Sequence, residues 1–134
     1  MDWNLEVVIV PVSDVDRAKK FYAEQVGFAV DHDTSINEDV RIVQLTPPGS
    51  SCSIVISKGL HKAEPGTLPG LQIVVSDIEA ARAELVERGV DASPVQHFEG
   101  PQPSEGPGGD WNSFVFFADP DGNNWSIQER PAGK

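Results

Sequence analysis

One short segment of the chain occurs twice. Val12-Ser13-Asp14 recurs as Val75-Ser76-Asp77, at an offset of 63 residues, and each copy follows an apolar run and precedes a helical pattern. Internal repetition constrains the architecture more strongly than any single element, because both copies must form the same supersecondary unit. The sequence therefore predicts two copies of one folding unit.

Each copy begins with a strand followed by a helix. In the first copy, Leu5–Val12 is rich in Val and Ile, which is typical of a buried strand. Asp14 is then well placed as the helix N-cap, and Gly27 as the residue that ends the helix. The second copy repeats this order with Leu71–Val75, Asp77 and Gly89.

Three short strand candidates follow each helix. They are Ala29–His32, Arg41–Thr46 and Ser53–Ser57, then Ser93–Phe98, Ser113–Ala118 and Asn124–Glu129. The last two strands are joined by Asp119-Pro120-Asp121-Gly122, where Pro suits the second turn position and Gly accepts a positive φ. The longest stretch without a pattern is Glu99–Asp110, which is either a surface loop or a lid over a site.

Three motifs together resemble one known family. They are Val-Ser-Asp-Val-Asp-Arg-Ala-Lys-Lys-Phe-Tyr from Val12, Val26-Gly27-Phe28, and Asp119-Pro120-Asp121-Gly122-Asn123. With the doubled unit, they resemble the vicinal oxygen chelate superfamily, which holds glyoxalase I, extradiol dioxygenases, and fosfomycin- and bleomycin-resistance proteins. The resemblance spans nearly the whole chain.

The resemblance implies an α+β fold. Two βαβββ modules, about 1–62 and about 66–130, would form a curled, barrel-like mixed sheet with the helices outside, in a single domain over 1–134. The concave faces would enclose a pocket. Many small members of the superfamily are homodimers, so a homodimer is expected.

Metal-dependent members hold an ion through residues on the first and last strands of each module. The resemblance places these positions at Val7, Val55, Gly70 and Ser126. Metal sites need several His, Cys or carboxylate side chains converging on one point, and these residues supply none. His32, His61 and His97 share no ligand-type spacing. We therefore expect neither a metal nor another cofactor.

Strand alternation predicts what lines the pocket instead. The candidates are Val7, Ile9, Ser53, Val55, Gln72, Asn124, Ser126 and Gln128, with Trp111 on an aromatic rim. Apolar walls with a few neutral hydrogen-bonding groups are typical of a small-molecule site. The alternative is structural: Gln72 and Gln128 would bond to each other or to the backbone in the core, and Trp111 would be core.

Charge and composition limit the partners. The 21 acidic and 10 basic residues give a net charge of −11, which repels nucleic acid and anionic lipid surfaces. No apolar run approaches the ~20 residues of a membrane span, and the N-terminus lacks a secretory signal pattern. A cytoplasmic location is expected. Cys52 is the single cysteine, so an internal disulfide is excluded.

The leading functional hypothesis is a metal-independent protein that binds a small, largely neutral organic molecule, similar to the bleomycin-resistance type. The alternative is a lyase, isomerase or dioxygenase-type enzyme acting on a small organic substrate. His97 is its candidate general acid or base, although a structural role for this residue is an open alternative. A purely structural or protein-partner role for the chain is the third hypothesis.

Overall fold

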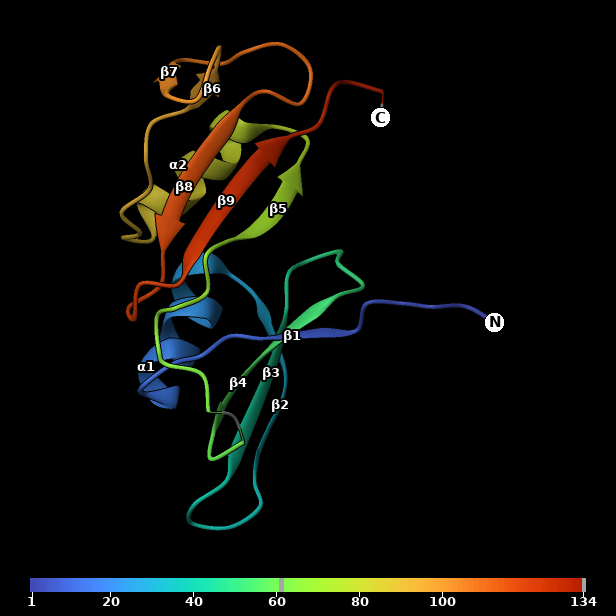
Figure 1. Ribbon diagram of the computed structural model, residues 1–134, viewed down its shortest axis with the longest axis vertical. Coiled ribbons are helices and arrows are strands. Elements are labelled where there is room, and N and C mark those ends of the chain that lie inside the picture. The colour runs from blue at the N-terminus through green and yellow to red at the C-terminus, as the bar shows by residue number, and fades with distance from the viewer. Residues whose placement is uncertain (61, 134) are drawn as a thin grey trace. The chain divides into compact units, whose positions relative to one another are not determined.

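The computed structural model describes residues 1–60 and 62–133, and the chain divides into two compact units. The first unit is Met1–Leu68 with Asp119–Asn123, and the second is Pro69–Ala118 with Asn124–Lys134. Each has one mixed sheet with helical structure on one face, as Figure 1 shows. The α+β class with two βαβββ-like modules is therefore confirmed, whereas a single domain over 1–134 stays a prediction.

The first unit contains a four-stranded sheet in the order β1-β4-β3-β2. Its elements are β1 (Val7–Ile9), α1 (Val15–Lys20), the π-helix η1 (Phe21–Val26), β2 (Ala29–Ser35), β3 (Arg41–Thr46) and β4 (Ser53–Lys58). The Asp14 side chain accepts a hydrogen bond from the Arg17 backbone N–H at 3.1 Å, which confirms the N-cap. Gly27 ends the helical segment at a φ of 91°.

The second unit contains a five-stranded sheet in the order β5-β9-β8-β6-β7. Its elements are β5 (Leu71–Val75), α2 (Ile78–Glu87), β6 (Gln96–Phe98), β7 (Pro103–Glu105), β8 (Phe114–Ala118) and β9 (Asn124–Glu129). Asp77 caps α2 by accepting from the Ala80 backbone N–H, and Gly89 follows the helix at a φ of 86°. In both units the first and last strands are parallel partners.

The structure shortens the predicted strands Leu5–Val12 and Ser93–Phe98 to β1 and β6, extends β2 beyond His32, and adds one element that the sequence does not predict. The stretch Glu99–Asp110, expected to lack structure, contains β7, which pairs antiparallel with β6. Pro103 opens this strand at the edge of the sheet, where its missing N–H leaves no ladder bond unmade. Among the described strands neither sheet closes on itself, and no described helix is long and apolar enough to span a membrane.

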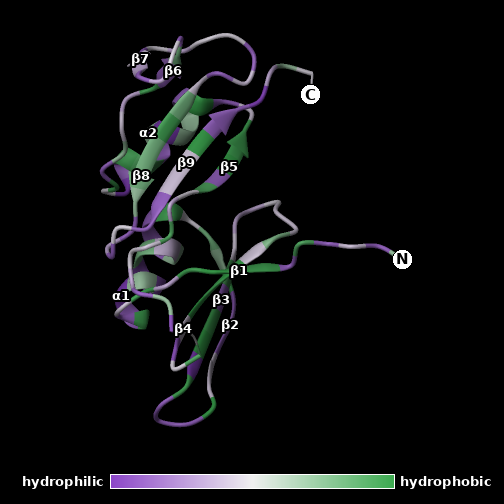
Figure 2. Ribbon diagram, viewed as in Figure 1, coloured by the Kyte–Doolittle hydropathy of each residue, from purple (hydrophilic) through white to green (hydrophobic). Residues whose placement is uncertain are grey.

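One face of each sheet is buried against the helix of its own unit. In the first unit, α1 packs against β4, and the buried residues there include Val43, Leu45, Ile54 and Ile56. In the second, α2 packs against β8 and β9, with Val115, Phe117, Trp125 and Ile127 buried. Figure 2 shows β8 in hydrophobic colours, whereas β9 has a hydrophobic band between pale and hydrophilic parts. The opposite face of each sheet is left open.

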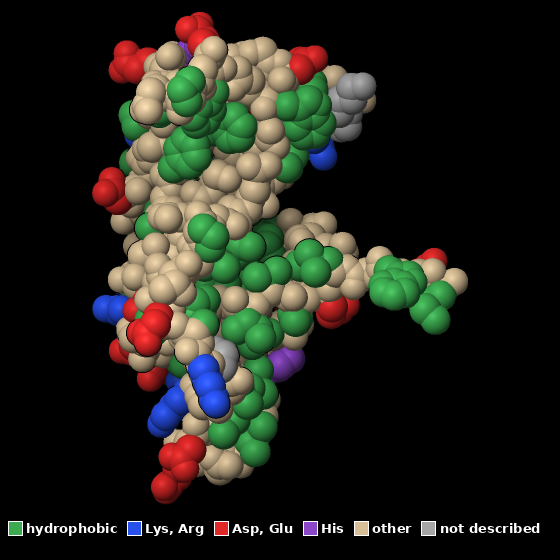
Figure 3. All heavy atoms as spheres, in the orientation of Figure 1, with side chains coloured by type: hydrophobic (Ala, Val, Ile, Leu, Met, Phe, Trp, Pro, Cys, Tyr) green, Lys and Arg blue, Asp and Glu red, His purple; other side chains and the backbone are tan. Residues whose placement is uncertain are grey.

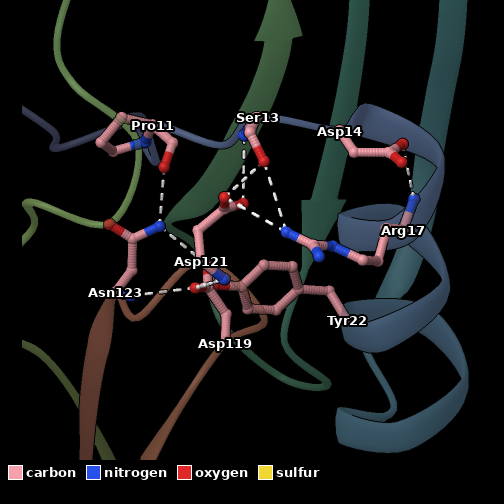
Figure 4. Close-up of polar contacts among 8 residues, drawn as sticks. All are labelled: Pro11, Ser13, Asp14, Arg17, Tyr22, Asp119, Asp121 and Asn123. Carbon is pink, nitrogen blue, oxygen red and sulfur yellow. Dashed lines mark hydrogen bonds and ion pairs between the residues drawn. The ribbon is translucent and has the colours of Figure 1, made fainter.

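The turn after β8 carries a fully satisfied buried carboxylate (Figure 4). Asp119 accepts from the Tyr22 hydroxyl at 2.7 Å and from the Asn123 side-chain amide at 2.8 Å. It also accepts from the backbone N–H groups of Asp121 and Asn123, at 3.0 and 2.9 Å. The same Asn123 amide donates to the carbonyl of Pro11 at 2.7 Å. Because burial penalises an unpaired polar group, these bonds lock the turn within the first unit.

Tyr22→Phe tests this network. The substitution removes one donor to a buried carboxylate, and it should lower the free energy of unfolding by about 1–3 kcal/mol. Urea unfolding of both proteins measures the difference. The control is Ser13→Ala, which removes an exposed hydroxyl bond to Asp121 and should have a smaller effect. A loss for Tyr22→Phe no larger than that of the control would contradict the assignment.

Candidate functional site

The open face of the second sheet carries part of the predicted site. Cross-strand partners point to the same face of a sheet, so the register decides which side chains meet. Two rows cross β8, β9 and β5: Phe116–Ser126–Gln72 and Phe114–Gln128–Val74. The structure thus brings Gln72, Ser126 and Gln128 together on one face. Their contact with a ligand stays a prediction.

An aromatic cluster forms one side of this face. The rings of Phe98 and Phe114 lie edge to face at 5.5 Å, and those of Phe98 and Phe116 do so at 6.3 Å. Phe114 and Phe116 are nearly parallel, with centroids 6.1 Å apart. All three are only partly buried, and Figure 3 shows hydrophobic side chains gathered over β6 and β8. Partly exposed rings at these spacings suit contact with another aromatic ring.

The polar residues beside the cluster form one continuous chain of hydrogen bonds, which we call the amide relay. Ser126 Oγ donates to Gln72 Oε1 at 3.2 Å. Gln72 Nε2 donates to Gln128 Oε1 at 2.9 Å, and Gln128 Nε2 donates to the backbone carbonyl of Trp111 at 2.8 Å. The two glutamines do bond to each other and to backbone, but on an open face and not in the core.

Trp111 has an unusual backbone conformation. Its φ of 61° is the only positive φ at a non-glycine residue in the part of the chain that the structure describes. The side chain is 45% exposed, so it is not core. Next to it, the Asn112 side chain accepts from the Phe98 N–H and donates to the Phe98 carbonyl, at 2.9 and 2.8 Å. Asn112 therefore braces the loop.

His97 does not belong to this face. It lies between Gln96 and Phe98 on β6, and strand alternation turns it to the opposite side. Its Nδ1 lies 2.9 Å from the carbonyl of Gly106, and its Nε2 lies 3.3 Å from a Glu99 carboxylate oxygen. The backbone carbonyl first, and then the Glu99 carboxylate, raise the pKa of His97. Both contacts stabilise the protonated form of the ring and tie it to the loop.

The titration of His97 checks this assignment. We expect its midpoint, followed by the ring proton signals in NMR, above the ordinary value of 6.5. The folded chain then holds the His97 proton more tightly than the unfolded chain does. His97 therefore makes its full contribution to the free energy of unfolding below about pH 6.5. That contribution is lost as the pH rises through the raised pKa. Glu99→Gln should lower the midpoint, and a wild-type midpoint at or below 6.5 would contradict the geometry.

The remaining predicted residues lie in the first unit. Val7 and Ile9 on β1 are 37% and 50% exposed. Val7 pairs with Ser53 and Ile9 with Val55 on β4. Ile9 and Gln72 are related by the repeat offset of 63 residues, and their strand partners Val55 and Ser126 hold corresponding positions on β4 and β9. These residues form the open face of the first sheet.

Sequence reasoning missed a polar group on the first sheet. Thr46 bonds to Asp31 and also to the buried Ser53 at 2.6 Å. Gln44 Nε2 donates to the same Asp31 carboxylate at 3.2 Å. The register shifts between Val30 and His32, which turns Asp31 to this face. No turn residue in the sequence marks this bulge, so alternation alone could not place Asp31.

A separate groove of about 1130 Å³ lies in the first unit, with Asp16, Arg41, Ser57 and Lys58 among its lining residues. Arg41 donates to Asp16 and to Asp33, each at 2.7 Å. Hydrogen bonds from Arg41, and next from Lys19, hold the pKa of Asp33 well below its usual range. None of the predicted site residues is among the described residues that line this groove.

Over residues 1–60 and 62–133, no three His, Cys, Asp or Glu side chains gather in a way that could hold a metal ion. His61, one of the three histidines considered above, lies outside the described residues. Asn124 begins β9 and is exposed, and Gly70 precedes β5 with open space where a side chain would stand. The absence of a metal from the working protein stays a prediction.

Comparisons with known proteins found one matching family and several similar proteins. Residues 4–127 match the model of the Glyoxalase/Bleomycin resistance protein/Dioxygenase superfamily. TnmS3, an antibiotic-binding protein from Streptomyces sp. CB03234, is 32% identical, with a TM-score of 0.77 over 97% of this chain and 98% of that one. A glyoxalase/bleomycin resistance protein from the same organism is 34% identical, with a TM-score of 0.73 over 93% and 99%. The uncharacterised YetH of Bacillus subtilis is 28% identical over 94% of this chain and 98% of its own.

Proposed function

Because this chain belongs to the glyoxalase/bleomycin resistance protein/dioxygenase superfamily, we propose that it binds a small, largely neutral organic molecule and releases it unchanged. The ligand lies on the open face of the second sheet, and no metal or other cofactor takes part. The similarity to TnmS3, which binds an antibiotic, supports a binding role for this fold. The role itself is argued from the site.

The observation that carries the proposal is the pairing of an aromatic cluster with the amide relay on one open sheet face. Phe98, Phe114 and Phe116 offer ring surface, while Gln72 and Gln128 offer neutral hydrogen-bonding groups. Small-molecule sites typically combine apolar walls with a few oriented polar groups. No charged side chain stands in the two rows that cross this face, so a largely neutral ligand fits best.

The proposal keeps two expectations from the family. Each open face is concave in a curled, barrel-like arrangement with the helices outside. On the first sheet, Val7, Ile9 and Val55 supply a further apolar lining with the Ser53 hydroxyl beside them, and on the second, Asn124 and Trp111 stand at the margin. The exposure of Val7 and Ile9 supports this, because exposed apolar side chains on one strand face favour contact with another apolar surface. A cytoplasmic location remains part of the proposal.

The enzyme alternative, a lyase, isomerase or dioxygenase-type activity, would need a proton-transferring group at the ligand. His97 is on the other face of β6, with both ring nitrogens near acceptors. The binding hypothesis therefore predicts a ligand recovered unchanged, whereas an enzyme would return a product. This difference decides between the two.

Binding is tested by titrating the protein with 9-fluorenone, a planar aromatic ketone, with NMR as the readout. We expect saturable binding, recovery of the ketone unchanged, and the same affinity with a chelator present. Phe116→Ala should weaken binding at least about fivefold, since a lost aromatic contact is worth about 1 kcal/mol. Ile36→Ala, an exposed apolar residue outside the site, is the matched control. Equal affinity for Phe116→Ala and wild type would place the ligand elsewhere.

We also propose a homodimer. β1 is an edge strand, and Leu5 and Ile9 are 71% and 50% exposed, with Trp3 90% exposed in the segment before it. An open edge with exposed apolar side chains favours association with a second copy. Sedimentation at micromolar concentration should show a dimer, and Leu5→Asp should shift it toward monomer. A wild-type protein that sediments only as monomer would refute this.

A further inference from the structure

We propose that the ligand meets the open face of the second sheet through hydrogen-bond acceptor oxygens carried on a planar aromatic ring. The inference rests on the proposed function and deepens it, because it assigns the chemical class of the ligand. It follows from the direction of the amide relay, which a backbone carbonyl sets at one end.

The hydrogen bonds of the amide relay can run in only one direction. The carbonyl of Trp111 can only accept, so the side-chain group of Gln128 that faces it at 2.8 Å must be the NH₂. The Gln128 oxygen is then turned to Gln72, whose own NH₂ must face it at 2.9 Å. This leaves the Gln72 oxygen to accept from the Ser126 hydroxyl at 3.2 Å. The oxygen and the NH₂ of a side-chain amide can be exchanged by rotating the group, so hydrogen-bond partners must assign them. Here the backbone carbonyl of Trp111 assigns them for both glutamines.

The carbonyl that sets this direction belongs to a braced turn. The Asn112 N–H donates to the Gly109 carbonyl, and the Gly108 N–H donates to the Asn112 carbonyl, each at 3.1 Å. A side chain at Gly108 would stand 2.4 Å from the Asn112 carbonyl oxygen, so the turn is closely packed. Trp111 holds a positive φ within it. Backbone strain of this kind persists only where the surroundings impose it.

Two amide donors remain for a ligand. Each NH₂ group has two N–H bonds, and the relay uses one from Gln72 and one from Gln128. The hydrogen bonds among described residues give no partner to the second N–H of either group. Both amide oxygens already accept one bond. A buried N–H without an acceptor costs more than a carbonyl oxygen that accepts one hydrogen bond where it could accept two. A ligand that covers this face must therefore bring hydrogen-bond acceptors.

The ring surface lies beside these donors. Phe116 is in the same row as Gln72, and Phe114 is in the same row as Gln128. A ligand ring on these phenylalanines therefore places its edge substituents over the relay. Carbonyl oxygens on a planar ring, as in aryl ketones, quinones and aromatic lactones, satisfy both features. A ring that presents only N–H or O–H donors at that edge would leave the amide donors unmet.

Three planar probes of one shape separate the possibilities. 9-Fluorenone carries a carbonyl oxygen, carbazole carries an N–H donor in its place, and fluorene carries neither. We expect 9-fluorenone to bind about tenfold more tightly than carbazole, with fluorene between them, and to shift the side-chain NH₂ signals of Gln72 and Gln128. Equal affinities for 9-fluorenone and carbazole would overturn the inference while leaving the proposed site intact. No saturable binding by any probe would overturn both.

Reversing the donor pattern provides the second test. Gln128→Glu replaces the NH₂ by a carboxylate oxygen, which cannot donate, so only the Gln72 donor remains and the preference for 9-fluorenone over carbazole should fall at least about threefold. Gln102→Glu adds the same charge on an exposed loop residue and should keep the wild-type preference. Gln72→Leu serves as the second variant if Gln128→Glu melts early, and it should reduce the preference at least about threefold. An unchanged preference in a folded variant would refute the role of the relay.

Discussion

The buried carboxylate of Asp119 is the contact on which the first unit depends. Its two oxygens accept four hydrogen bonds, from the Tyr22 hydroxyl, the Asn123 side chain and two backbone N–H groups. A buried charge is tolerated only when its hydrogen-bonding capacity is used, so any displacement of the turn would leave it partly unmet. Asp121 of the same turn adds bonds to Ser13 and Arg17 at the start of α1. The beginning of the first helix and the turn after β8 are thereby held together.

One face of each sheet forms the core of its unit, and the other face is open. The helix-covered face of each is apolar and buried, and it carries the packing energy. The open face carries side chains that packing does not need, and on the second sheet these are aromatic rings and neutral amides. Alternation along β9 makes this possible, because Trp125 and Ile127 are buried while Ser126 and Gln128 point the other way. The same strand thus serves the core and the proposed site.

Several elements of the fold could be predicted from local patterns. The N-caps Asp14 and Asp77 and the strand ranges of β3, β5 and β9 agree with the structure, because caps and apolar periodicity act over a few neighbouring residues. β7 could not be predicted, since a three-residue strand beginning with Pro carries no periodic signal. Asp31 was missed for a related reason: a bulge changes which face a residue occupies, and the pairing that creates it is not local.

For the site, the sequence alone determined which residues share a face. The resemblance supplied the anchor positions Gly70 and Ser126, and a period of two then placed Gln72, Ser126 and Gln128 on one face, because alternation is a property of the extended chain itself. Only the tertiary structure decided what these residues do to one another. Gln128 meets the carbonyl of Trp111, which a braced turn with a positive φ carries to it. Nothing in the local pattern specifies that approach, since it arises from contacts between residues 17 positions apart.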